Sequence, residues 1–411
     1  MVGWTRYRLV MAGFFGLTGM GNGLWGACLP AVDARLDLGP GRLGVVLLVL
    51  GVGTLVTMPV TGALADRVGG RRVLRVASVL FAASLAGPAV AGSYPALVAG
   101  MLLLSLVLGV LNVALTVQAV DLERSEQRPT MATLHGVWAL GALTGGGATA
   151  AALRAGADSR LIMLCGAAVA ATALLVVGRL LPPPAPVAPT TASTGPAGPL
   201  PTFGLVVLLG LIGAAAFLTE NAATDWAGVH ARRVLGADTA TASLAYTVFF
   251  AAMTGVRLLG DAVRARLGAA RVVLLAGTTA SVGYGVILLT PALGAGRVAV
   301  ALGGWVLAGA GMALMWPIVS STVGAAFPGR AKSLSLVTTL SYGGGLLGPA
   351  VMGYAASATS LSSAMVIPAA LVVLVTVTAP RVLRLLTAAA PAAATPAAAT
   401  PAAAPAPVRQ G

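Results

Sequence analysis

Residues 62–72 read GALADRVGGRR and lie between two long apolar runs. Gly69 and Gly70 allow a tight reversal of the chain that side chains would obstruct. The arginines are typical of a loop that stays on the cytoplasmic side of a membrane, whereas acidic residues contribute little to topology. Asp66 therefore needs another explanation. We expect a cytoplasmic loop whose charges pair with neighbouring helix ends in one conformation and separate in another.

The composition around this loop is that of a membrane protein. Of the 411 residues, 58% are hydrophobic and only 9% are charged, and the mean hydropathy is +0.94. Soluble globular proteins carry about 25% charged residues. The chain is therefore predicted to be an all-α polytopic membrane protein that crosses the lipid bilayer several times.

Twelve apolar runs are long enough to cross a bilayer as helices, which takes about 20 residues. Six precede residue 182, at roughly 9–31, 43–64, 73–92, 95–117, 131–153 and 160–181. Six follow residue 201, at roughly 203–224, 240–260, 271–292, 298–320, 333–356 and 363–380. This pattern predicts twelve transmembrane helices in two pseudo-symmetric six-helix bundles.

The boundaries of these bundles follow from the composition. Residues 1–181 form the predicted N-terminal bundle and residues 202–385 the C-terminal one. The Pro-rich residues 182–201 between them read as a cytoplasmic linker, and residues 386–411 as a disordered Ala/Pro-rich tail. Short stretches repeat at an offset near 199, as with Asn22 and Asn221.

The net charge of +14 (25 basic against 11 acidic residues) reflects topology and not nucleic-acid binding. Basic residues sit in short clusters between the apolar runs, and most lie on one side if the N-terminus is inside. Both termini are therefore predicted to be cytoplasmic, with the chain in the plasma membrane. Two cysteines and two histidines make a metal site untenable. No phosphate-binding loop occurs, so neither a nucleotide nor any other cofactor is expected.

The loop at 62–72 resembles the signature loop of the major facilitator superfamily, whose usual form is G-x-x-x-D-R-x-G-R-R. Gly70 replaces the first terminal basic residue of that form. Three stretches, at 128–136, 220–226 and 341–349, look like its rhizopine-transporter-like (MosC-like) branch. The resemblance implies a secondary transporter that works by alternating access. Resemblance to neighbouring permease branches also implies proton coupling and a sugar-like cargo.

The resemblance also implies a conformational latch at the cytoplasmic helix ends. Its candidate residues come from the loop and from a degenerate copy in the second half: Gly62, Asp66, Arg67, Gly69, Arg71, Arg72, Asp261, Arg266 and Gly268.

Ionisable residues within membrane spans are rare and usually functional. Glu220 is expected in the outer third of its span, where a lone buried carboxyl could exchange a proton as a cavity opens and closes. Asp225 and His135 are the other proton-coupling candidates, since histidine titrates near neutrality. Each has a structural alternative: Glu220 could reach the membrane surface, Asp225 could anchor the end of its span, and His135 could make a structural hydrogen bond.

Polar and aromatic side chains in other spans are candidates for a substrate cavity, because amides can bind hydroxyls and a ring offers a flat apolar surface. These are Asn22, Trp25, Asn112, Trp138, Asn221, Arg257, Trp316 and Tyr342. For the amides the alternative is a hydrogen bond between helices. For Arg257 the alternative is a pair with Asp261, one turn further on the same helix.

The predicted function is therefore secondary active transport of a small polar solute, with protons as the coupling ion. Drug or metabolite efflux is the alternative, and a non-transporting membrane sensor is a remote one. An intramembrane enzyme is disfavoured because no paired acids, histidine cluster or nucleophile with a base share a membrane depth, so no catalytic residue is assigned.

Overall fold

The computed structural model describes residues 5–126, 130–181, 202–315, 317–319 and 331–389, and these residues contain helices but no strand. The first half holds α1 (Arg6–Leu36), α2 (Gly39–Val68), α3 (Gly70–Ser84), α4 (Ala86–Val90), α5 (Tyr94–Glu126), α6 (Met131–Arg154) and α7 (Ser159–Arg179). The second holds α8 (Phe203–Arg233), α9 (Thr239–Leu267), α10 (Ala269–Leu289), η1 (Thr290–Ala292), α11 (Arg297–Met312), α13 (Ala331–Ala358), α14 (Leu361–Ala364) and α15 (Val366–Ala389).

The helices confirm the predicted membrane fold. Among the described residues, 10 candidate spans are long and apolar enough to cross a membrane. The two further predicted spans, at 9–31 and 333–356, coincide with α1 and α13, which pack among the others. The linker at 182–201 lies outside the described residues, as do residues 390–411. α15 continues to Ala389, slightly past the predicted end of the second bundle.

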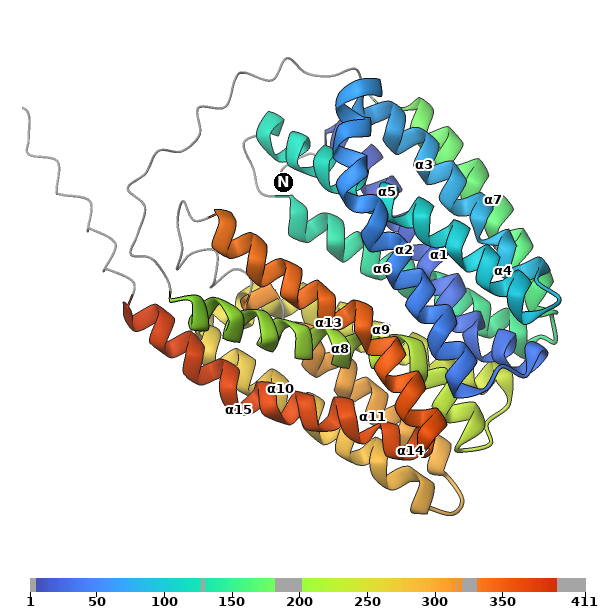
Figure 1. The fold of residues 1–411 in the computed structure, drawn as a ribbon, viewed down its shortest axis with the longest axis vertical. Coiled ribbons are helices and arrows are strands. Elements are labelled where there is room, and N and C mark those ends of the chain that lie inside the picture. Colours follow the sequence, from blue (N-terminus) through green and yellow to red (C-terminus); the bar gives the residue numbers. More distant parts are fainter. Residues whose placement is uncertain (1–4, 127–129, 182–201, 316, 320–330, 390–411) are drawn as a thin grey trace, which may run out of the picture.

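The two halves repeat one packing scheme (Figure 1). In the first half α1 packs on α6 and α7, α2 on α5, and α3 on α5 and α7. In the second half α8 packs on α13 and α15, α9 on α11, and α10 on α11 and α15. Contacts between the halves follow the same symmetry, since α2 meets α13 while α6 meets α9.

Two glycines at equivalent positions make the same turn in each half. Gly69 lies between α2 and α3 with a φ of 91°, and Gly268 lies between α9 and α10 with a φ of 79°. Residues that carry a side chain rarely adopt a backbone with such a positive φ. The reversal expected at Gly69 is therefore confirmed, whereas Gly70 already begins α3.

Small residues let the central helices of each half approach closely. A Cβ on Gly141 of α6 would lie 2.9 Å from the carbonyl carbon of Gly16 in α1. A Cβ on Gly344 of α13 would lie 2.6 Å from the carbonyl carbon of Ala214 in α8. The close approach expected from glycine spacing is thus present in both halves.

The two halves contact each other at the face of the molecule where α1 ends at Leu36, α8 ends at Arg233 and α9 begins at Thr239. We call this the distal face, because it lies at the opposite end of these helices from the linker at 182–201. The hydroxyl of Ser243 in α9 donates to the carbonyl of Ala27 in α1 at 2.6 Å.

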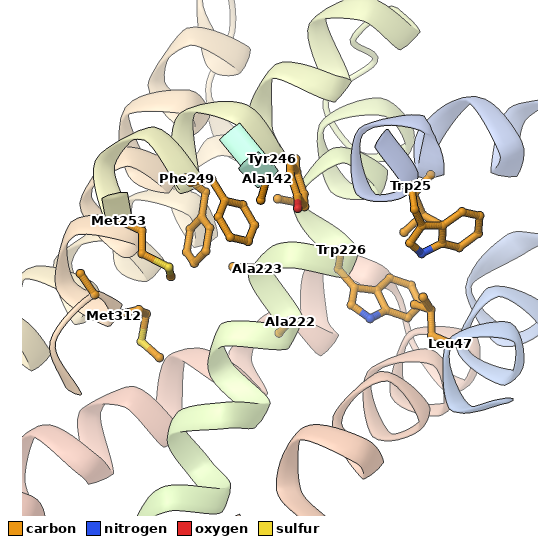
Figure 2. Packing of buried hydrophobic residues seen from close by; sticks show 14 of the residues in the cluster. Trp25, Leu47, Ala142, Ala222, Ala223, Trp226, Tyr246, Phe249, Met253 and Met312 are labelled. Carbon is orange, nitrogen blue, oxygen red and sulfur yellow. The ribbon is translucent and has the colours of Figure 1, made fainter. Parts of the chain in front are cut away.

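Buried apolar side chains from both halves form one cluster. Figure 2 shows Trp25 and Leu47 of the first half with Trp226, Tyr246 and Phe249 of the second.

Asp238 caps α9, and its replacement tests a helix end outside the membrane spans. Asp238 Oδ1 accepts from the Thr241 backbone N–H at 3.0 Å, and Oδ2 accepts from the Thr241 hydroxyl at 2.6 Å. We expect Asp238→Ala to lower the free energy of unfolding by about 1 kcal/mol, whereas Asp238→Asn, which keeps a capping oxygen, should change little. Thermal unfolding in detergent measures both.

The same cap predicts a pH dependence. The hydrogen bond from Thr241 holds the pKa of Asp238 below its usual value. A folded-state pKa below that of the unfolded chain gives stability that is present above the unfolded pKa and lost as the pH falls through the folded one. The difference between wild type and Asp238→Ala should therefore shrink in acid. Equal midpoints for the Ala and Asn variants at neutral pH would contradict the capping role.

Candidate functional site

An acid and a base on adjacent helices form the polar centre of the second half. Arg257 of α9 places Nη2 3.6 Å from Oε1 of Glu220 in α8, and the two side chains are 24% and 18% exposed. Arg257 Nε also donates to the carbonyl of Ala313, just after α11, at 3.2 Å. Charged residues within spans almost always face the interior of the helix bundle or a water-filled cavity.

The depth of Glu220 differs from the expectation. The predicted span ended at residue 224, but α8 continues to Arg233. At 1.5 Å per residue, Glu220 lies about 25 Å from the start of a helix about 45 Å long, near its middle and not in its outer third. The expectation of a lone carboxyl was also wrong, because Arg257 is its partner.

Aromatic side chains of two neighbouring helices lie close to Glu220 along α8. Tyr342 of α13 stacks on Phe217, one turn before Glu220, with ring centroids 5.0 Å apart and an interplanar angle of 26°. Tyr284 of α10 donates to the carbonyl of Thr219, the residue before Glu220, at 2.6 Å. The stacked pair gives the site a flat apolar surface next to its charges.

The first half faces this centre with one histidine. His135 of α6 meets Phe15 of α1 edge to face, with centroids 5.4 Å apart, and it lies within electrostatic range of Arg257. Trp138 of α6 meets Phe250 of α9 at 6.2 Å. These contacts place Trp138 against α9 of the second half and His135 near Arg257.

Other cavity candidates have structural roles. Asn221 donates from Nδ2 to the carbonyl of Gly345 in α13 at 2.9 Å, and Asn22 donates to the carbonyl of Thr18 on its own helix at 3.1 Å. The bond of Asn221 is the hydrogen bond between helices that was its alternative, whereas the bond of Asn22 stays within α1. Trp25 is 5% exposed and belongs to the buried cluster of Figure 2.

Of the remaining candidates, Asn112 and Asp225 have no hydrogen bond or ion pair with Glu220 among the described residues. Asn112 is half-buried on α5, where its carbonyl accepts from Thr116. Asp225 lies about 7.5 Å further along α8 than Glu220. Trp316 lies outside the described residues.

The predicted latch is only partly described. The guanidinium of Arg71 lies 5.4 Å from the ring centroid of Tyr7 in α1, so this loop packs on its own half. Arg67, Arg72 and Arg266 are exposed. The surroundings of Gly62 and the side chains of Asp66 and Asp261 lie outside what the structure describes.

Sequence reasoning missed one ion pair between the halves. Asp33 of α1 is fully buried, and Arg233 of α8 binds both of its carboxylate oxygens. A signal was present: Asp33 is an acid near the end of a span, where topology does not require one. Asp33, like Asp66, is an acid that topology alone does not explain.

Comparison with known proteins identifies the family. The model of the Major Facilitator Superfamily matches residues 11–293. The uncharacterized transporter y4wD of Sinorhizobium fredii is 33% identical over 383 residues, or 92% of this chain and 98% of that protein. The membrane protein MosC of Rhizobium meliloti is 26% identical over 353 residues, or 85% of this chain and 84% of that protein. A solved D-xylose-proton symporter shares the fold, with a TM-score of 0.71 at 17% identity over 90% of this chain and 95% of its own.

Proposed function

This chain belongs to the major facilitator superfamily, and we propose that it moves a small polar solute together with protons by alternating access. It is a membrane transporter and not an enzyme. The proposed solute is sugar-like or another small polar metabolite. The proposed location is the plasma membrane, with both termini and the linker at 182–201 in the cytoplasm, because most arginines then lie inside.

The observation that carries the proposal is the pair of Glu220 and Arg257 within the span region. While Glu220 is ionised, it neutralises Arg257. When Glu220 takes up a proton, the guanidinium loses its counter-charge and can bind oxygen atoms of a solute. Proton binding at Glu220 and solute binding at Arg257 then favour each other, because linkage between two sites is reciprocal. His135 and Trp138 would complete the site from the first half.

Central charges favour a polar cargo over a lipophilic one. A lipophilic solute would have to displace water from Glu220 and Arg257 without replacing its hydrogen bonds, which is unfavourable. The stacked rings of Phe217 and Tyr342 would serve as the apolar surface that packs against the carbon skeleton of a polar solute.

A ligand panel tests the proposal. Thermal unfolding of the purified protein would be followed with sugars, polyols, amino sugars, organic acids and lipophilic cations. A ligand at 100 times its Kd stabilises the folded state by about 2.7 kcal/mol, so a polar compound should raise the midpoint in a concentration-dependent way.

Uptake of that compound into liposomes, with a pH gradient of either sign, then tests the coupling. Binding by lipophilic cations alone would replace the proposal with efflux. If the rate of uptake does not depend on the pH gradient, the proposed proton coupling is disproved, but transport of the solute stands.

A further inference from the structure

The distal face holds a buried ion pair that is shared between the two halves. Arg233 of α8 donates from Nε to Oδ2 of Asp33 at 2.5 Å and from Nη2 to Oδ1 at 2.8 Å. The Asp33 side chain is 0% exposed. Arg232 supports it with Nη1 3.7 Å from Oδ2. Bidentate pairing of a guanidinium with a carboxylate is among the strongest polar contacts in proteins.

The partners come from different halves, and this decides what the pair can do. Asp33 lies on α1, and the described bases that pair with it, Arg232 and Arg233, lie on α8. A buried charge without a partner is strongly unfavourable. Alternating access moves the two halves against each other about a central site. When the distal face opens, Asp33 and Arg233 must therefore separate and both become hydrated.

Uncharged contacts seal the space just below the pair. The Ser243 hydroxyl, 0% exposed, donates to the carbonyl of Ala27. A Cβ on Gly228 of α8 would lie 2.5 Å from Cγ of Pro30 in α1. Helices α1, α8 and α9 thus pack tightly beneath the pair, and the Asp33 carboxylate is fully buried while the Arg233 side chain is 25% exposed.

We propose that Asp33 and Arg233, supported by Arg232, form a charged gate that holds the distal face closed. The gate is separate from the Glu220 and Arg257 site, and it rests only on membership of a family that works by alternating access. Asp37 offers a natural comparison on the same stretch of chain. Its Oδ1 lies 3.6 Å from Nη2 of Arg233, but its side chain is 97% exposed. Water screens so exposed a pair, which therefore contributes little, and Asp37 serves as the control.

The test measures how often the distal face opens. In a Cys28→Ala/Cys165→Ser background, Ser243→Cys places one thiol in the seal, where a membrane-impermeant maleimide reaches it only when that face is open. The reagent is added to intact cells, on the side that the distal face meets. Its labelling rate is proportional to the open fraction.

We expect Asp33→Asn to raise this labelling rate at least about tenfold, because a shift of about 1.4 kcal/mol in the conformational equilibrium changes the open fraction by that factor while it is small. Asp37→Asn should leave the rate unchanged. Arg233→Gln should have a smaller effect than Arg232→Gln/Arg233→Gln, because Arg232 can partly replace its neighbour.

Two further variants separate gating from folding. Asp33→Asn/Arg233→Gln removes both charges, leaves no unpaired buried carboxylate, and should also label faster. Ser357→Cys near the end of α13 is already exposed, so it should label equally in every variant and reports the amount of folded protein. If the doubly neutral variant labels at the parent rate while Ser357→Cys is unchanged, the pair is only structural and the gate is disproved.

Discussion

Replacing Glu220 with Gln should abolish uptake driven by a proton gradient, by about 100-fold or more, while exchange of labelled for unlabelled solute continues. Glutamine keeps the shape of the side chain but cannot release a proton, and it leaves Arg257 without the counter-charge that lies 3.6 Å away in the wild type. Solute can still bind and the halves can still rock, so exchange survives. Uptake into liposomes with and without a pH gradient, compared with exchange at equal pH, measures the split.

Asp225 is the matched control for this experiment, because it is a carboxylate on the same helix and forms no ion pair with Arg257 among the described residues. We expect Asp225→Asn to keep the response to the pH gradient. His135→Gln should also keep that response, but it should weaken solute binding because His135 is part of the proposed site. Loss of the response in one of these variants, with Glu220→Gln unaffected, would move the coupling site to that residue.

The second large effect is expected from one methyl group at a helix crossing. Gly344→Ala should destabilise the protein by about 3 kcal/mol or more, because the new Cβ would lie 2.6 Å from the carbonyl carbon of Ala214. Backbone on both sides forms this contact, so no flexible side chain can move away. The midpoint of thermal unfolding in detergent, together with the yield of monodisperse protein, measures the change.

An adjacent glycine provides the control. A Cβ on Gly343 has nothing within 4 Å, and alanine is preferred to glycine inside a helix by about 0.5–1 kcal/mol. Gly343→Ala should therefore be neutral or stabilising. The first half offers the same comparison, with Gly141→Ala crowded against Gly16 and Gly136→Ala in open space. Equal midpoints for Gly343→Ala and Gly344→Ala would show that this crossing is looser than the structure describes.

The sequence alone was sufficient to predict the class of fold, the glycine turns and the close helix crossings. Spans are local runs of apolar residues, and the free energy of transfer into the bilayer depends on each run by itself. The reversal at Gly69 depends on the absence of a side chain at one position, and Gly268 repeats it. The spacing of Gly141 and Gly344 likewise marks close crossings without reference to distant residues.

Which polar side chains meet was decided only by the tertiary structure. Glu220 and Arg257 are far apart in the sequence, and so are Asp33 and Arg233. Whether two such residues pair depends on how each helix is rotated about its axis and on where it ends. Apolar spans carry little record of either, because a helix that is hydrophobic all round can bury any of its faces. Packing between helices fixes the rotation, and with it the partners of each buried charge.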